Sequence, residues 1–315
     1  MQPSLESCAY EPFSPGPYAV RTESFEARDE ARGRLFPCDV WRPDQTGDWP
    51  LIAFSHHSFG SRRAATFLTT HLANHGYVVG ALDHSEVIAP AGNVDEIIAN
   101  RVPDVQFLIG RLLKICADDS SAADAKRIGI VGHSFGGWTA LAAPESNERI
   151  AAVVAMAPGG ASNPKPGIIP ATLSFRWKRP PATLYLVAED DVALPIAGMY
   201  ELYERTPGAK QMVILRRADH FHFLDNVEER HEQTRAMTFP PAAAWIPREM
   251  RPIGELCSGE QAHQFIRGLT LAHLDATLKG NPEARRLLHK NLARTLAANA
   301  IDGYEHGALR RESRV

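Results

Sequence analysis

The stretch that decides the fold is residues 127–138, RIGIVGHSFGGW. Residues 128–131 are a short apolar run, typical of a parallel strand that is covered on both faces. Glycines then stand on either side of a single serine, Ser134, in the order Gly-x-Ser-x-Gly, before a predicted helix. The turn from strand to helix is so sharp that side chains at Gly132 and Gly136 would collide with the neighbouring backbone. The pattern therefore predicts that the Ser134 hydroxyl is raised above the edge of a sheet.

This arrangement is the nucleophile elbow of the α/β-hydrolases. A serine hydroxyl is a weak nucleophile until a base removes its proton, so the elbow requires a base and an acid elsewhere in the chain. In this fold the three residues follow the order Ser, Asp, His. The backbone N–H of Phe135 is expected to point to the same place as the Ser134 hydroxyl. Without the two partners, the stretch would be a glycine-rich turn with an incidental serine.

Strand-like and helix-like segments alternate along the rest of the chain. This rhythm favours an α/β class of fold with a mostly parallel sheet and helices on both faces. Apolar runs predict strands over residues 18–25, 33–41, 50–55, 77–84, 150–158, 182–188 and 211–215. Helical spacing predicts helices over residues 67–75, 102–116, 138–143, 196–205, 259–279 and 282–296, with a hairpin turn over 26–33 and a loop over 85–100. We expect residues 1–315 to form a single domain.

The composition is that of an ordinary globular protein, with 44% hydrophobic and 23% charged residues. The formal net charge of −3 gives no basic footprint for a nucleic acid. Four cysteines are scattered without a CxxC pair, and Cys38 and Cys116 stand in apolar runs that predict buried thiols. The N-terminus has no basic start followed by an apolar stretch, and no apolar run is long enough to span a membrane. We therefore expect a cytoplasmic protein; the sequence does not indicate its oligomeric state.

The acid is expected in a loop that follows a strand. The pattern Ala188-x-x-Asp191-x-x-x-Pro195 is similar to the Gly-x-x-Asp-x-x-x-Pro loop of these hydrolases. Asp191 would orient the histidine and stabilise its charged form. Asp190 is the competing candidate, and the alternative to both is a solvated acidic turn, because Glu189 makes three carboxylates in a row.

The base is expected after the last strand, where His220 stands in the stretch 218–223, ADHFHF. A neutral imidazole can take the Ser134 proton at physiological pH. His222 is the local alternative. A His-x-His pair also raises the question of a metal, which His56 and His57 could approach, but no further ligand stands at suitable spacing nearby. We therefore expect no metal and no cofactor.

A second donor for an oxyanion, beside the Phe135 amide, should come from the loop of residues 56–60, HHSFG. Related enzymes usually have His-Gly at the start of this loop, and His57 replaces that glycine. The replacement leaves open whether the amide of Ser58 or that of Phe59 points inward, although losing such a donor costs about 10²–10³ in kcat. The side chain of His56 is expected to make a structural hydrogen bond to the loop.

The chain resembles α/β-hydrolases grouped with the plasma-type platelet-activating-factor acetylhydrolases and with bacterial dienelactone-hydrolase-like proteins. The segments that carry the resemblance are residues 33–43, 54–62, 81–84, 101–113, 132–137 and 220–223. Two features depart from these families. Dienelactone hydrolases have cysteine where this chain has Ser134, and the acetylhydrolases take their acid after an earlier strand, where residues 154–160 lack a carboxylate.

These residues predict a serine hydrolase that cleaves carboxylic esters with a short or small acyl group through an acyl-enzyme. An amidase, a polyester hydrolase or an acyltransferase would use the same site, and a non-catalytic binding protein on this fold is the remaining alternative. The expected pocket is apolar. Its predicted walls are Phe59, Phe135, Phe175, Trp177, Phe221 and Trp245.

The remaining predictions concern less informative segments. Residues 226–257, with prolines at 240, 241 and 247 among others, are expected to form a partial cover over the site, the alternative being that they pack elsewhere and lead to the final helices. Residues 307–315 are expected to be a disordered tail. Asp83 and His84 are expected to cap a turn, and Trp138 to be core. The histidines on or beside helices are expected at the surface: His71, His75, His263, His273 and His289.

Overall fold

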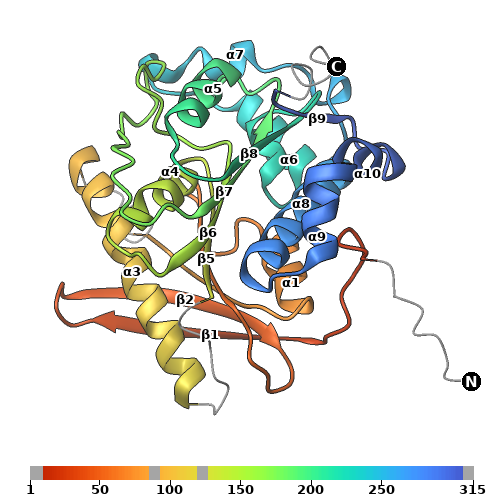
Figure 1. The fold of residues 1–315 in the computed structure, drawn as a ribbon. Coiled ribbons are helices and arrows are strands. Elements are labelled where there is room, and N and C mark those ends of the chain that lie inside the picture. Colours follow the sequence, from red (N-terminus) through yellow and green to blue (C-terminus); the bar gives the residue numbers. More distant parts are fainter. Residues whose placement is uncertain (1–9, 85–92, 119–126, 308–315) are drawn as a thin grey trace, which may run out of the picture.

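The computed structural model describes residues 10–84, 93–118 and 127–307, which fold around one central sheet (Figure 1). Within these residues the sheet has nine strands in the order β1-β2-β4-β3-β5-β6-β7-β8-β9. The strands are β1 (Val20–Asp29), β2 (Arg34–Pro43), β3 (Leu51–Ser55), β4 (Val78–Leu82), β5 (Ile128–His133), β6 (Ile150–Met156), β7 (Ala182–Ala188), β8 (Lys210–Leu215) and β9 (Gly303–Glu305). The six strands β3 to β8 pair in parallel, and the outer strands pair antiparallel, as predicted for a mostly parallel sheet.

Helices cover both faces of this sheet (Figure 1). One face carries α1 (Thr66–Asn74) and α8 (Gly259–Leu278), and the other carries α3 (Val94–Asp118), α4 (Phe135–Ala142) and α5 (Ile196–Arg205). Successive side chains of a strand point to opposite faces. Ile52 accordingly packs in the core on the α8 side, while Leu51 packs on the α4 side. All five residues of β3 are buried, which explains why its first four residues are apolar.

Shorter elements complete the chain. The helices are α6 (Val227–Ala236), α7 (Ile246–Glu249), α9 (Pro282–Arg286) and α10 (Leu292–Ala298), with a π turn at Leu287–Asn291 and 3₁₀ turns at Ala143–Glu145, His220–Phe223, Pro241–Ala243 and Ile253–Glu255. Asn281 caps α9 by accepting from the amides of Glu283 and Ala284, as its sequence predicts. Cys38, Cys116 and Cys257 are buried thiols, which confirms the prediction for the first two positions.

Two predicted boundaries on the N-terminal side are wrong. α3 begins at Val94, so residues 94–100 are helical rather than loop. Buried Ile97 and Arg101 extend the packed face of the helix to these earlier residues. Residues 85–92 of the predicted loop lie outside the described residues. The hairpin strands also end later than predicted, at Asp29 and at Pro43.

The C-terminal third holds two elements that the sequence did not reveal. α6 lies inside residues 226–257, ahead of the prolines that disfavour regular structure. β9 adds a short antiparallel strand to β8, so residues 211–215 are not the last strand. Three residues give too little alternation for a strand to be recognised. Of the predicted tail over 307–315, all but Gly307 lies outside the described residues.

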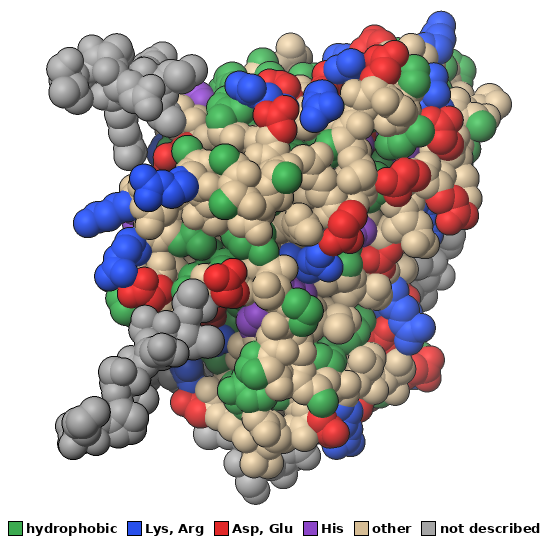
Figure 2. Space-filling model, turned by 90° about the vertical axis from the view of Figure 1, so that its right-hand side faces the viewer, with side chains coloured by type: hydrophobic (Ala, Val, Ile, Leu, Met, Phe, Trp, Pro, Cys, Tyr) green, Lys and Arg blue, Asp and Glu red, His purple; other side chains and the backbone are tan. Residues whose placement is uncertain are grey.

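The surface mixes charges of both signs. On the face shown in Figure 2, Lys and Arg side chains alternate with Asp and Glu side chains, without one continuous basic area. Among the described residues, no helix is both long and apolar enough to cross a membrane. The cytoplasmic location stays a prediction.

Candidate active site

The elbow has the strained geometry that its glycines predict. Ser134 lies between β5 and α4 with φ 59° and ψ −118°, in a region that residues with a side chain rarely adopt. A Cβ atom at Gly132 would collide with the backbone of Gly136, and one at Gly136 would collide with the carbonyl of Ser55 at the end of β3. Glycine at both positions therefore lets the elbow lie directly against the neighbouring strand.

A chain of hydrogen bonds joins Ser134, His220 and Asp191, which come from three separate loops. The Ser134 Oγ lies 2.9 Å from His220 Nε2, and His220 Nδ1 lies 2.7 Å from Asp191 Oδ2. The other carboxylate oxygen of Asp191 accepts from the Leu194 amide at 2.8 Å, which fixes the carboxylate. The structure thus brings together the three residues predicted to act as nucleophile, base and acid, in the order that the triad requires.

The environment of His220 suits a base. Burial by itself lowers the pKa of His220, but the charge of Asp191 and the hydrogen bond to it outweigh burial and raise the pKa above the ordinary histidine value. Two further imidazoles lie close by. The ring centre of His133 is 4.7 Å from that of His220 and 5.6 Å from that of His57. Burial lowers the pKa of both, to about 3 for His57, so they stay neutral beside the base.

The two alternative residues have other partners. Asp190 faces Arg251, whose Nη1 lies 3.2 Å from the carboxylate. His222 is buried, with Nδ1 2.8 Å from Asp219 Oδ1 and Nε2 3.0 Å from the carbonyl oxygen of Cys257. Burial lowers the pKa of His222, but the Asp219 carboxylate outweighs this and raises it to about 10. Both ring nitrogens of His222 therefore have partners other than Ser134, so this histidine is not placed to act as the base.

The loop of residues 56–60 follows β3 and lies against the start of α4. Ser58 and Phe59 form the centre of a turn that the Gly60 amide closes by donating to the His57 carbonyl at 3.1 Å. Phe59 has φ 55° and leaves 66% of its surface exposed. His56 makes the expected structural bonds, to the His57 carbonyl at 2.6 Å and from the His84 amide at 3.1 Å.

Three predicted pocket aromatics lie near the triad or beside its loops. The Phe221 ring centre is 5.9 Å from that of His220, and Phe59 stands at the exposed tip of the 56–60 loop. Trp245 packs in a small apolar cluster with Phe221 and with Val192, the neighbour of Asp191. The segment 226–257 is therefore in contact with residues adjacent to two triad members.

The prediction that three further aromatic side chains line the pocket is wrong. The Phe135 ring is 4% exposed and stacks on Trp138, which is core as predicted. Trp177 is buried and donates to the carbonyl of Leu141, near the end of α4 that lies away from Ser134. Phe175 lines a surface hollow with Leu141 at that same end. A loop rich in aromatic residues does not show which end of a helix it covers. The sequence therefore could not show that these rings lie away from the pocket.

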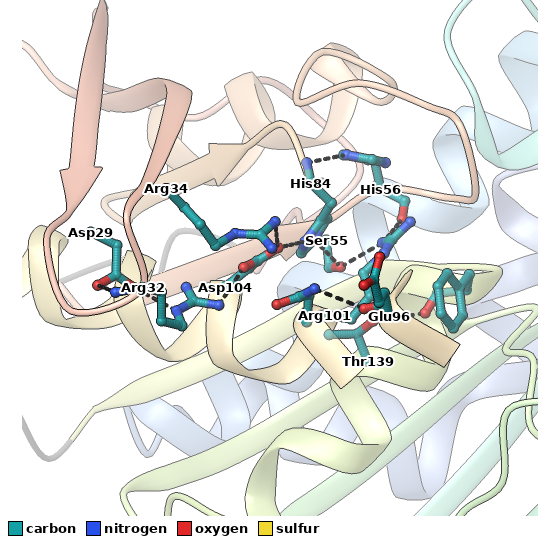
Figure 3. A network of polar contacts seen from close by, with 12 residues as sticks. Asp29, Arg32, Arg34, Ser55, His56, His84, Glu96, Arg101, Asp104 and Thr139 are labelled. Atoms are coloured by element: carbon teal, nitrogen blue, oxygen red, sulfur yellow. Dashed lines mark hydrogen bonds and ion pairs between the residues drawn. The ribbon is translucent and has the colours of Figure 1, made fainter. Parts of the chain in front are cut away.

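A buried polar network next to the elbow was missed (Figure 3). His84 is fully buried between Ser55 and Asp104 and is not a turn cap, while Asp83 binds the Arg62 amide at 2.7 Å. Arg101, also fully buried, donates to the His56 carbonyl at 2.6 Å. The signal was present in α3, where Arg101 and Asp104 interrupt an otherwise apolar face at a spacing of three residues.

Further histidines also differ from expectation. His71 and His273 are buried and hydrogen-bonded to the carbonyls of Pro12 and Ala182, rather than lying at the surface. Within the part of the chain that the structure describes, no group of three or more His, Cys, Asp or Glu side chains is arranged to hold a metal ion.

Comparison with known proteins assigns a family. The model of the chlorophyllase family matches residues 8–179, more than half of the 315-residue chain. The chain belongs to this family. Its members are serine-esterase-like α/β-hydrolases, which confirms the predicted fold. The finer resemblance to platelet-activating-factor acetylhydrolases and dienelactone hydrolases is not supported. The matched residues include Ser134 and end before Asp191 and His220.

Similar curated proteins carry the same family name. "Chlorophyllase-1, chloroplastic" of Citrus unshiu is 26% identical over 139 residues, which are 44% of this chain and 41% of that protein. The protein of the same name from Citrus sinensis gives the same identity and coverage. "Chlorophyllase-1" of Arabidopsis thaliana is 29% identical over 109 residues, 34% of this chain and 32% of that protein. The alignments therefore span less than half of these relatives.

Proposed function

We propose that the protein hydrolyses carboxylic esters with a short or small acyl group, with Ser134, His220 and Asp191 as the catalytic triad. The observation that carries the proposal is the unbroken hydrogen-bond chain from Ser134 through His220 to Asp191 at a strained elbow. Membership in a family of esterase-like hydrolases supports the same reaction class.

The reaction has two halves. His220 Nε2 takes the Ser134 proton as Oγ forms a bond to the ester carbonyl carbon, and backbone amides hold the resulting oxyanion. The C–O bond to the alcohol then breaks, and His220 returns the proton to the leaving alcohol. Water attacks the acyl-enzyme in the same manner, with its proton passing through His220 to Ser134. Asp191 holds the imidazole in the tautomer that presents Nε2 to Ser134.

The direct test is covalent labelling by a fluorophosphonate, read by peptide mass spectrometry, followed by turnover of an ester panel. We expect one label, on Ser134, and hydrolysis of p-nitrophenyl esters that falls as the acyl chain grows. Chlorophyll belongs on the panel because the relatives are named for it. An amide panel and added alcohol acceptors separate the amidase and acyltransferase alternatives. A protein that takes no label and cleaves no ester would contradict the proposal.

The segment 226–257 is proposed as the cover that limits acyl size. Trp245 is half-buried, and its Nε1 donates to the Pro166 carbonyl at 2.9 Å, which ties the segment to another loop. It packs against the same small apolar cluster as Phe221, the residue next to His220. A bulky ring at this place would exclude long acyl groups and water from the site.

Trp245→Ala is therefore expected to change the order of preference among acyl lengths more than it changes the melting temperature. Trp49→Ala is the matched control, because Trp49 stands just before β3, at the opposite end of that strand from the loop of residues 56–60. The control should leave the order of preference unchanged. An unchanged order in Trp245→Ala, together with a large fall in melting temperature, would make Trp245 a packing residue only.

A further inference from the structure

We infer that a buried network formed by Arg101, Ser55, His84 and Asp104 positions the backbone amide of Ser58 as the second oxyanion donor. The inference rests on the proposed function and goes beyond it, since none of the four side chains belongs to the triad. Each of them is completely buried, with relative exposure of 0%. Figure 3 shows them side by side, reaching from α3 and β4 to the end of β3.

The proton positions in the network follow from the partners. Burial lowers the pKa of His84 well below its usual range, so the ring is neutral. Its Nδ1 lies 3.1 Å from the carboxylate of Asp104, which also accepts from Arg32 at 2.8 Å. The proton of His84 is therefore on Nδ1, and Nε2 accepts from the Ser55 hydroxyl at 2.9 Å. This chain ties the last residue of β3 to the carboxylate of α3.

Arg101 holds the two carbonyls that follow. Its Nη1 donates to the His56 carbonyl at 2.6 Å, and its Nη2 donates to the His57 carbonyl at 3.2 Å. His56 holds the same His57 carbonyl from within the loop, because its Nε2 accepts from the His84 amide and its Nδ1 donates to that oxygen at 2.6 Å. The planar guanidinium presents its donors in a fixed fork, which orients two acceptors at once.

The direction of one carbonyl fixes the direction of one amide. The His57 carbonyl and the Ser58 N–H belong to the same peptide unit, and the described residues contain no cis peptide bond. In a planar trans unit these groups point in opposite directions. Holding the His57 oxygen toward Arg101 therefore turns the Ser58 N–H away from Arg101. This geometry favours Ser58 over Phe59 as the donor.

Arg101 also contacts the other proposed donor segment. Its guanidinium carbon lies 4.5 Å above the ring centre of Phe135, whose amide is the first oxyanion donor. The first turn of α4 touches the loop as well, because Gly136 lies against the carbonyls of Ser55 and His56. One buried cation thus sets the spacing between the segments that supply both amides. Such preorganisation lets the donors stabilise the developing charge without moving during the reaction.

The test compares Arg101→Met and Arg101→Lys with a matched control, Tyr77→Phe. The control removes a buried hydrogen bond of 2.7 Å, from Tyr77 to Asp275 of α8, on the opposite face of the sheet. Active sites are counted by fluorophosphonate titration, and kcat and KM are measured per titrated site. Inhibition is measured with a trifluoromethyl ketone, which forms an oxyanion on Ser134, and with the corresponding methyl ketone, which binds largely without forming it.

Arg101→Met is expected to lower kcat by about 10²–10³ while KM changes little, because the lost interaction acts in the transition state. Trifluoromethyl ketone binding should weaken by a similar factor, and methyl ketone binding should not. Arg101→Lys, which keeps the charge and loses the fork, should lie between Arg101→Met and wild type. Tyr77→Phe should lower the melting temperature and leave kcat, KM and the binding of both ketones unchanged.

Two other outcomes would overturn the inference. If Arg101→Met behaves like the control, with lower stability but unchanged kcat per titrated site, Arg101 has only a structural role. If wild type takes no label and cleaves no ester, the proposed function fails and the inference fails with it. Should Arg101→Met not fold, Ser55→Ala and Asp104→Asn test the same network, and unchanged kcat and trifluoromethyl ketone binding in both would equally overturn it.

Discussion

Ser134→Ala is expected to lower kcat for ester hydrolysis by about 10⁴ or more, because the variant cannot form the acyl-enzyme. The Ser134 Oγ lies 2.9 Å from His220 Nε2. The backbone of Ser134 is held independently, because its N–H donates to the Met156 carbonyl and its carbonyl accepts from the Gly159 N–H. Removing the hydroxyl should therefore leave the elbow in place. Activity would be followed with a short-chain p-nitrophenyl ester and stability by thermal unfolding.

The control for this variant is Ser146→Ala, an equal change at an exposed serine beyond the other end of α4. It should keep wild-type kcat. Ser134→Ala should also take no fluorophosphonate label while binding a product acid as wild type does. Retention of more than about a hundredth of wild-type kcat would show that Ser134 is not the nucleophile.

The elbow could be predicted from the sequence because its physical requirements are local. Two glycines, one serine and an apolar strand lie within a few residues of one another, and the collisions that demand glycine arise from the turn itself. Asp191 and His220 could be predicted because each follows a strand, and the carboxyl ends of parallel strands meet at one edge of a sheet. Chain order and strand position narrowed the choice to Asp190 or Asp191 and to His220 or His222, and the Ala188-x-x-Asp191-x-x-x-Pro195 pattern favoured Asp191.

The rest of the site depends on contacts between distant segments. Ser55, His84 and Asp104 come from β3, the end of β4 and α3, and nothing in their spacing shows that they meet. The prediction that Phe175 and Trp177 line the pocket was wrong for the same reason, because both lie at the other end of α4. A charged residue within an otherwise apolar helix face is the signal that a sequence does carry. A buried arginine in an apolar helix face requires partners, so such a residue marks a position to be explained by tertiary structure.

The acid of the triad should be identified by a pair of adjacent substitutions. Asp191→Asn is expected to lower kcat by about 10⁴, since an amide cannot hold the imidazole in the required tautomer or stabilise its charged form. Asp190→Asn is the matched control, because the Asp190 carboxylate faces Arg251 at 3.2 Å instead of the site. Surface ion pairs of this kind contribute little, so the control should keep nearly all activity and stability.

The pH dependence gives a second, independent measurement of the same pair. Asp191 raises the pKa of His220, and the base acts in its neutral form, so wild-type kcat/KM should fall as the pH drops through that raised pKa. Removing the charge lowers the pKa of His220, and the residual activity of Asp191→Asn should therefore persist to lower pH than wild type. The charge of Asp219 also raises the pKa of His220 and remains in the variant, so the shift reports Asp191 alone. Equal, mild losses in both variants with unshifted acid limbs would place the acid elsewhere in the chain.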